Sequence, residues 1–358
     1  MSTIFDYVTA PEMAAYITKE TSNAIPYLGE TLFPSKKQVG TNISWLTGAD
    51  GLPIAIQPSN FDAKATLRER TAFGKMETEM AFFREAMRIG EKDRQEINKL
   101  LNHPNSTIAL PIIKNIFDDV KKLVDGVNAQ AEIMRMELLQ GGTITVKGVN
   151  NGASYKYDYK MALEHIKTVT NKWDVPATSD PINDIMEMQN LIEEETGIRP
   201  TRCIMNRQTF LQMIKSESLR KLMYPNITSG MISKIIVTEA QVKTYVEETL
   251  SIKLVVYSKK VAQLGKDGLQ GATVQLIKDG NVVLLPEGNI GYTWYGTTPE
   301  ESDLLAGGTD AQVSLIKNAT AITTYKEKHP VNVMTIVSSV MIPSFESINN
   351  VAVLKVLS

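Results

Sequence analysis

The sequence has a single cysteine, Cys203, among its 358 residues. One cysteine cannot form a disulfide within the chain, which suits a protein that folds in a reducing compartment. Cys203 lies in the apolar run RCIMN. A nucleophilic cysteine needs a basic or histidine partner to form the thiolate, and the sequence marks none. We therefore expect Cys203 to be a small buried hydrophobic residue.

Histidine is also scarce, and common metal-binding and phosphate-binding patterns are absent. His103, His165 and His329 are far apart, and none belongs to an HxxxH or ExxH pattern, so the sequence predicts no metal site. There is no GxxxxGKS/T run and no strand-borne GxGxxG, and a turn explains the GNIG stretch at Gly288–Gly291 better. The acidic triplet Glu193–Glu195 is expected to face solvent. The sequence thus predicts no catalytic, cofactor-binding or metal-binding residues, and no cofactor.

Neither sign of charge is in large excess. Lys and Arg total 38 against 40 Asp and Glu, for a net charge of −2. Because nucleic-acid binders normally carry a basic excess, we expect at most weak contact with DNA through a local patch. No apolar run approaches the roughly 18 residues of a membrane span, and the longest, Met334–Pro343, is interrupted by Ser338 and Ser339. The N-terminus lacks the pattern of a signal peptide, so we predict no membrane partner.

The composition is that of a folded protein, with 43% hydrophobic and 22% charged residues. A chain of 358 residues corresponds to about two domains. Short apolar pieces alternate with proline and glycine over residues 1–60. Apart from a short amphipathic helix over Ala10–Thr21, this pattern predicts an extended segment with turns. Such a segment needs another surface to lie on, either on its own subunit or on a neighbour.

Residues 61–100 are dense in charges of both signs. The alternation in Thr66–Met80 indicates two strands with a turn at Thr71–Gly74, and Ala81–Leu100 fits a helix equally well. Two interpretations of the charges remain open. They form either a solvated face or an extended loop that pairs with a charged patch on another copy.

The clearest helix is Pro111–Gln140, where apolar residues recur at three- and four-residue steps. Proline suits its first turn and Gly141–Gly142 end it, so it spans about 45 Å. Gly142–Met161 then indicates a hairpin. Its second strand places three tyrosines on one face, namely Tyr155, Tyr157 and Tyr159. Packing of this stripe against a neighbouring element is favoured over a ligand platform.

The second half alternates helices with short strands, which indicates an α+β or small α/β domain. Helices are predicted at Asp180–Gly197, Arg207–Met223 and Thr238–Glu248. Strands are predicted at Arg202–Asn206, Lys253–Tyr257, Thr273–Ile277 and Asn281–Leu285. The last 28 residues, VNVMTIVSSVMIPSFESINNVAVLKVLS, contain two strand-like runs. We expect Val331–Ile342 and Asn350–Leu357 to pair as buried strands through a turn at Ser344–Asn349.

Three segments together carry a family resemblance. They are TGIRPTRCIMNRQTFLQMIKSESLRKLM at Thr196–Met223, PEGNIGYTWYGTT at Pro286–Thr298, and the C-terminal run at 331–358. In this order and near these spacings they resemble the second half of the lambda-type tailed-phage major capsid protein family (capsid protein E family). The resemblance implies an α+β fold, the tailed-phage major capsid fold, with an N-terminal arm, an extended loop, a long spine helix, a peripheral domain and an axial domain. The implied limits are 1–50 for the arm, 51–105 for the loop, 106–179 for the spine helix and first part of the peripheral domain, 180–330 for mainly the axial domain, and 331–358 for closing strands of the peripheral domain.

The same resemblance implies a function and partners. It predicts a major capsid protein that is not an enzyme and that self-assembles, as pentamers and hexamers, into the icosahedral head shell around double-stranded DNA. Implied partners are other copies of itself, a separate scaffolding protein, a portal protein, a decoration protein as a further candidate, and packaged DNA by weak non-specific contact. A separate scaffold is expected because no long charged helical extension precedes the arm. The expected location is the virion, with assembly in the host cytoplasm.

Two other classes of function remain open. One is a different ring-forming virion protein such as a tail tube, although tube proteins are mostly β and this sequence predicts a long central helix. The other is a cytoplasmic α+β enzyme whose catalytic residues converge from distant positions.

Overall fold

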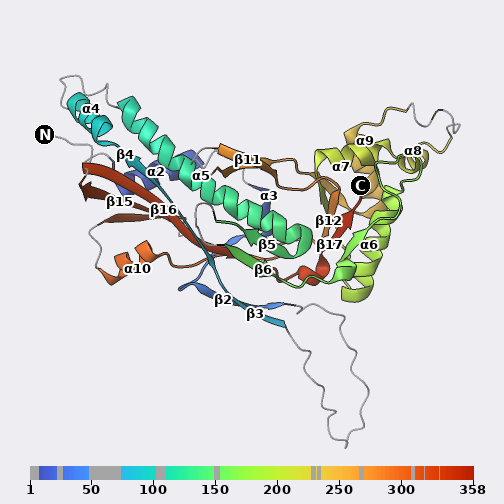
Figure 1. The fold of residues 1–358 in the computed structure, drawn as a ribbon. Coiled ribbons are helices and arrows are strands. Elements are labelled where there is room, and N and C mark those ends of the chain that lie inside the picture. Colours follow the sequence, from blue (N-terminus) through green and yellow to red (C-terminus); the bar gives the residue numbers. More distant parts are fainter. Residues whose placement is uncertain are drawn as a thin grey trace, which may run out of the picture. The chain divides into compact units, whose positions relative to one another are not determined.

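Figure 1 shows the helices and strands of the computed structural model along the chain. The described segments belong to two compact units. The described residues are 8–21, 27–47, 74–101, 110–148, 154–226, 231, 235–265, 270–307, 311–317, 319–329 and 331–358. Unit 1 comprises Met1–Ile43, Glu77–Ile133 and Tyr292–Ser344, and unit 2 comprises Ser44–Met76, Met134–Gly291 and Phe345–Ser358. Each unit is therefore assembled from stretches that are distant in sequence.

A six-stranded sheet forms the centre of unit 1. Its path is β1 (Ser35–Lys37), β13 (Thr293–Tyr295), β16 (Val331–Pro343), β15 (Thr320–Lys328) and β14 (Gln312–Ile316), and β4 (Ala81–Ile89) also pairs with β16. The pairs of β16 are all antiparallel, and its register with β4 runs from Val333 opposite Ile89 to Met341 opposite Ala81. Because β16 has three neighbouring strands, it is buried along most of its length. Nine of its thirteen residues are apolar, and the buried hydroxyls of Ser338 and Ser339 donate to Glu300 and to the carbonyl of Ala319.

The first helix that the described residues contain packs its apolar side on this sheet. The predicted helix at Ala10–Thr21 is confirmed as α2, which lies against β14 and β15. Ala10, Met13 and Ile17 have no exposed surface. The following helix α3 (Leu28–Leu32) leads into β1, which pairs in parallel with β13. The sequence predicts that the N-terminal segment lies either on its own subunit or on a neighbour. Its described part packs on its own subunit.

The charged stretch after residue 74 contains both a strand and a helix. Residues 81–89 form β4, so the helix considered for all of Ala81–Leu100 is wrong in its first half, and α4 (Glu91–Leu101) is confirmed as the second. The Arg, Glu, Ala and Met residues of this segment favour a helix locally. The segment is nevertheless a strand, because nine consecutive residues pair with β16 in the sheet. Upstream, β3 (Gly74–Glu79) pairs with β2 (Asn42–Thr47). The rest of the predicted hairpin at Thr66–Met80 lies outside the described residues, as does about half of the predicted extended loop at 51–105.

The long helix predicted at Pro111–Gln140 is confirmed as α5 (Leu110–Gly141). Its 32 residues correspond to about 48 Å. Gly142 ends it with φ of +64°, and its amide donates to the carbonyl of Leu138 at 2.8 Å. A side chain at this position would clash, since a Cβ would lie 2.5 Å from that of Met161. The hairpin of β5 (Thr143–Val146) and β6 (Tyr155–Asp158) follows as predicted, with most of its turn outside the described residues.

Unit 2 is built around a five-stranded sheet. Its order is β7 (Ile166–Thr168), β17 (Ala352–Lys355), β12 (Asn281–Leu285), β8 (Arg202–Met205) and β9 (Lys253–Val256). The two outer pairs are parallel and the two inner pairs antiparallel. Among the described residues, four α-helices lie wholly in this unit: α6 (Pro181–Thr196), α7 (Arg207–Lys215), α8 (Glu217–Met223) and α9 (Glu239–Leu250). A separate two-stranded ribbon consists of β10 (Lys260–Leu264) and β11 (Gln270–Gln275).

Both faces of this sheet are buried at its centre. Val282 and Leu284 of β12 join the core that the helices cover, and Val283 and Leu285 point the other way but are equally inaccessible. This explains the uninterrupted apolar run at Val282–Leu285. Trp173 is fully buried in the same core and donates its indole N–H to Asp184 of α6 at 2.8 Å.

The predicted helix at Arg207–Met223 is wrong in its continuity, because it is broken into α7 and α8 at Ser216. Ser216 has extended backbone angles, and its hydroxyl donates to the carbonyl of Ser179 at 3.0 Å. A serine that bonds to a distant backbone group favours such breaks. The helices predicted at Asp180–Gly197 and Thr238–Glu248 are confirmed as α6 and α9, with Gly197 left-handed after α6 and a capping box between Thr238 and Gln241 before α9.

The two C-terminal strands do not pair with each other, so the predicted hairpin is wrong. β16 belongs to the sheet of unit 1, and β17 lies between β7 and β12 in unit 2. The segment Ser344–Asn350 is not a tight turn, since it contains the fully buried Phe345 and the short 3-10 helix η4 (Ile348–Asn350). Residues 331–358 therefore do not close one sheet. Both runs are apolar and β-branched, so local sequence could not distinguish their partners.

Candidate assembly surfaces

Cysteine and histidine are among the residue types most often used in catalysis, but Cys203 has a structural role. Cys203 lies on β8 with no exposed surface, and burial raises the pKa of its thiol well above the usual range. The prediction of a buried hydrophobic cysteine is confirmed. A thiol held protonated in an apolar core is a poor nucleophile.

The histidines do not form a site in the described part of the chain. His103 lies outside the described residues. His165, in the 3-10 turn η2 (Leu163–His165), is almost fully buried, and its Nε2 lies 2.7 Å from the carboxylate of Glu195 at the end of α6. His329 follows β15 in the other unit. Among the described residues, no group of three or more His, Cys, Asp or Glu side chains could hold a metal ion.

The acidic triplet and the GNIG stretch also have ordinary structural explanations. Glu193 pairs with Arg199, Glu195 contacts His165, and Glu194 is exposed. The GNIG stretch lies in the bend between β12 and β13, where Gly288 has φ of +83°. The guanidinium of Arg202 stabilises this bend by donating to the carbonyls of Pro286 and Gly288. The predictions of a solvated triplet and of a turn are confirmed.

The tyrosine stripe on β6 packs within its own unit. The rings of Tyr155 and Tyr157 stack with centroids 6.1 Å apart. Tyr159 is nearly inaccessible and lies 5.4 Å from the ring of Trp45, and burial raises its pKa. Packing, the favoured interpretation, is confirmed.

Charged residues of β4 fix a helix on the sheet of unit 1. Arg84 lies 2.6 Å from the Oε1 atom of Glu300, at the start of α10 (Pro299–Ala306), and the hydroxyl of Ser338 donates to its Oε2 at 2.7 Å. The guanidinium of Arg84 also lies 4.7 Å above the ring of Phe82. The charged stretch is thus not only a solvated face, because part of it makes specific contacts within its own subunit.

The next residue of α10, Glu301, forms an ion pair with Lys37 of β1. Lys37 donates to the largely buried Glu301 at 2.6 Å and to the carbonyl of Gly296 at 3.0 Å. The first turn of α10 is therefore held by two carboxylates, one directed to β1 and one to β4 and β16. Its last turn exposes Leu304 and Leu305 to solvent.

Two bonds join the N-terminal segment to α5 within unit 1. The hydroxyl of Tyr16 donates to Asp118 at 2.5 Å, and this bond is the main reason that the pKa of Tyr16 is raised to about 12. The amide of Gly29 donates to the fully buried Glu132 at 3.0 Å. The described part of the predicted arm is therefore anchored to its own subunit.

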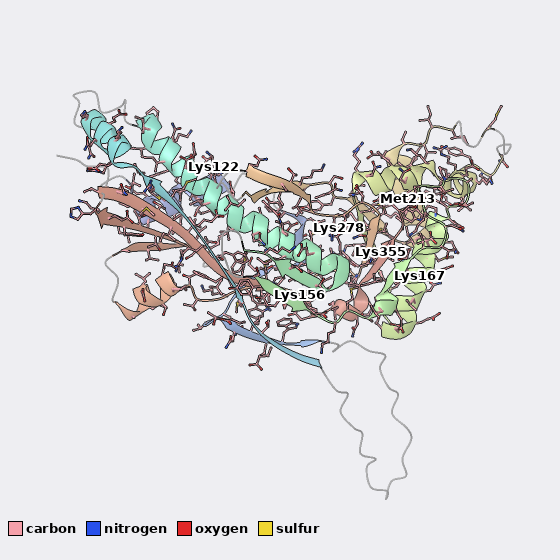
Figure 2. The ribbon with its side chains drawn as sticks, in the orientation of Figure 1. Lys122, Lys156, Lys167, Met213, Lys278 and Lys355 are labelled. Carbon is pink, nitrogen blue, oxygen red and sulfur yellow. The ribbon has the colours of Figure 1, made fainter. Side chains whose placement is uncertain are left out.

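Unit 2 presents two helical faces of opposite charge. The α6 face consists of exposed side chains spaced to share one side of α6, namely Met186, Glu187, Asn190, Glu193 and Glu194. The α7–α8 face consists of five exposed side chains of the two following helices, namely Gln208, Leu211, Lys215, Lys221 and Leu222. Figure 2 labels Lys167 beside α6, where its amine lies 2.9 Å from Glu187, and Met213 at α7, on the buried side of that helix.

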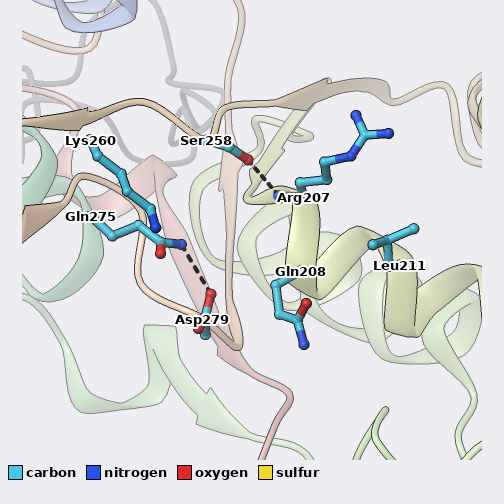
Figure 3. Close-up of a pocket in the computed structure, with 7 residues that line it drawn as sticks. All are labelled: Arg207, Gln208, Leu211, Ser258, Lys260, Gln275 and Asp279. Atoms are coloured by element: carbon cyan, nitrogen blue, oxygen red, sulfur yellow. Dashed lines mark hydrogen bonds between the residues drawn. The ribbon is translucent and has the colours of Figure 1, made fainter.

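The α7–α8 face continues into a shallow pocket of about 330 Å³. Figure 3 shows the lining side chains, which are Arg207, Gln208, Leu211, Ser258, Lys260, Gln275 and Asp279. Ser258 accepts a hydrogen bond from the amide of Arg207 at 2.7 Å, and Gln275 donates to Asp279 at 3.0 Å. The pocket carries two basic side chains, Arg207 and Lys260, and one acidic side chain, Asp279.

Comparison with known proteins identifies the kind of molecule that offers such surfaces. The family model described as phage major capsid protein E matches residues 9–356. The chain belongs to the phage major capsid protein E family. The resemblance stated from the sequence is confirmed, and so is the prediction of a structural protein that is not an enzyme. The match does not support the alternatives of a tail tube or a cytoplasmic enzyme.

Solved structures agree with the family assignment. A protein described as a prophage capsid protein from Escherichia coli CFT073 superposes with a TM-score of 0.63 at 16% identity, covering 98% of this chain and 99% of its own. A phage-related protein from Bordetella bronchiseptica RB50 gives 0.56 at 13% identity, covering 99% and 98%. The capsid protein of cyanophage A-1(L) gives 0.52 at 11% identity, covering 93% and 92%. At these identities the likeness shows the fold, and it confirms the α+β tailed-phage capsid fold. No curated protein matches the chain.

As a member of this family, the protein is a component of a phage virion, where copies of the capsid protein form the shell. Among the helices of the described residues, none is long and apolar enough to cross a membrane. The surfaces described above are therefore candidates for contacts between copies.

Proposed function

We propose that this major capsid protein builds the icosahedral head of a tailed phage as pentamers and hexamers that enclose double-stranded DNA. The observation that carries the proposal is the family match over residues 9–356, which leaves almost none of the chain for another activity. A closed shell needs at least two different faces on each copy, because head-to-tail contacts generate rings. The two oppositely charged faces of unit 2 meet this requirement.

Unit 2 is proposed as the axial domain, which surrounds the five-fold and six-fold positions. Unit 1, with the six-stranded sheet and the first part of α5, is proposed as the peripheral domain. In this assignment the axial domain takes its last strand, β17, from the C-terminus, and residues 292–344 return to the peripheral domain. The roles of arm and extended loop for residues 1–50 and 51–105 remain predictions.

The further partners are proposed on the same basis. A separate scaffolding protein is proposed as a partner because the chain belongs to a capsid family, and the resemblance to that family implies one. A portal protein would occupy one vertex, and a decoration protein is a further candidate on the outer surface. The net charge of −2 is compatible with weak, non-specific contact with the packaged DNA. Assembly is proposed to take place in the host cytoplasm before DNA enters.

Electron microscopy of the purified full-length chain tests the proposal. The chain should be produced alone and together with the virion proteins encoded beside it. Closed shells or isolated five- and six-membered rings are the expected particles. Tubes or single subunits under both conditions would contradict it.

A further inference from the structure

The α7–α8 face combines apolar side chains with unpaired positive charge. Leu211 and Leu222 expose 39% and 49% of their surface. Lys215 and Lys221 are exposed beside them, and neither forms an ion pair among the described residues. Exposed leucines are individually common, but two of them together with two unpaired lysines on consecutive helices form a surface suited to an acidic, partly apolar partner.

The α6 face has the complementary chemistry within the same unit. It contains three glutamates. Glu187 pairs with Lys167 and Glu193 pairs with Arg199. Glu194 has no ion-pair partner among the described residues. Met186 lies among them with 38% of its surface exposed. The α6 face therefore carries one unpaired negative charge, on Glu194, and an exposed apolar side chain, Met186, which complement the α7–α8 face.

We propose that the α7–α8 face of one copy docks on the α6 face of the next copy around each ring. This inference rests on the proposed function and names the faces by which neighbouring copies meet. The occupant of the α7–α8 face is a second copy of this chain, because the chain itself carries the matching charge and the family forms shells from copies. Lys215 and Lys221 would lie near Glu194 and the ends of the other α6 glutamates.

The charges also select how copies can pair. Two α6 faces brought together would place glutamates against glutamates, and two α7–α8 faces would place lysines against lysines, and both arrangements are repulsive. Only the unlike pair is attractive, and an unlike pair is a head-to-tail contact that continues around a ring. The charge pattern thus disfavours two-fold dimers through these faces and favours rings.

Disulfide cross-linking of the full-length protein tests the contact directly. The only native cysteine, Cys203, is fully buried, so an E194C/K215C variant carries just two reactive thiols. These thiols cannot meet within one chain. Ser216 bonds to Ser179 just before α6 begins, and Glu194 lies about fourteen residues further along that helix, or roughly 21 Å away. A disulfide needs Cα atoms within about 7 Å.

Under mild oxidation, assembled E194C/K215C protein should give a ladder of covalent species up to five and six copies on a non-reducing gel. The single variants E194C and K215C should remain monomeric. A matched control, K156C/K215C, uses the exposed Lys156 of β6 and should give no ladder. Dimers from E194C alone would show a two-fold contact and overturn the inference.

Charge exchange gives a second, independent readout. We expect K215E and E194K each to reduce the assembled fraction several-fold at fixed protein concentration, and K215E/E194K to recover at least half of it. K156E should assemble as the wild type does. Thermal melts identify any variant that is unfolded. The recovery should weaken with added salt because both charges are exposed.

The outcomes separate this inference from the proposed function. A wild-type chain that forms neither rings nor shells would contradict both. Wild-type shells with no ladder from E194C/K215C and no effect of K215E would overturn only the docking of these faces. Normal assembly of K215E with loss of scaffold binding or DNA packaging would assign the α7–α8 face to that partner and overturn the inference as well.

Discussion

Replacement of Leu354 by alanine should test whether the C-terminal strand is a structural centre of unit 2. Leu354 of β17 is fully buried, belongs to the core that the helices cover, and pairs with Val282 of β12 and Lys167 of β7. Truncation of a buried leucine removes its transfer free energy and leaves a cavity, so the free energy of unfolding should fall by about 2–5 kcal/mol. For a unit of 150–250 residues, each kcal/mol corresponds to about 2–4 °C in Tm.

The matched control is Lys355→Ala, one position further along the same strand. Lys355 is exposed, so its substitution should change stability by no more than about 0.5 kcal/mol. Urea or thermal unfolding of both variants, followed by circular dichroism, measures the difference. Equal stabilities for Leu354→Ala and Lys355→Ala would refute the placement of β17 in the core.

Deletion of residues 350–358 extends the same reasoning. It removes β17 from between β7 and β12, together with the fully buried side chains of three valines and one leucine, Val351, Val353, Leu354 and Val356. At about 1.5–3 kcal/mol for each side chain, the loss is roughly 6–12 kcal/mol, comparable with the whole stability of a typical domain. We expect insoluble protein, and a soluble truncation that melts cooperatively would contradict the fold.

Three further predictions concern single residues. Gly142→Ala should lower stability by roughly 1–3 kcal/mol in urea unfolding because of its positive φ and the lack of room for a Cβ, whereas Gly141→Ala, which has room, should not. The pKa of Tyr16 is raised to about 12, mainly by its hydrogen bond to Asp118. That bond should therefore stabilise the fold fully below about pH 10, and this stabilisation should be lost as the pH rises through 12. Tyr16→Phe should remove this pH dependence from the free energy of unfolding. Cys203 should react with a thiol reagent only after denaturation, and fast labelling of the native protein would refute its burial.

Several elements were predictable because their signals are local. Helices α5 and α6 each have periodic apolar residues, a proline in the first turn and a glycine at the C-terminal end. These signals lie within the helix itself and specify it without reference to the rest of the chain. The burial of Cys203 and the packing of the tyrosine stripe followed from residue type and period two. The order of these elements also sufficed for the family resemblance, although no short motif carries it.

The candidate surfaces were only partly predictable. A solvated side of α6 could be expected from Glu193–Glu195, since acidic residues on a helix usually face water. The α7–α8 face could not, because the break at Ser216 depends on a hydrogen bond to Ser179, which is distant in sequence. Its complementarity to the α6 face is a property of the folded unit.

The sequence by itself therefore determined the helices with strong periodicity, the absence of recognisable catalytic patterns and the family. Only the tertiary structure decided that β4 is a strand, and that β16 and β17 belong to different sheets. The physical reason is the same in each case. A helix makes its hydrogen bonds between residues four apart, but a strand makes them with a partner that can lie anywhere in the chain, and similar apolar runs do not specify that partner.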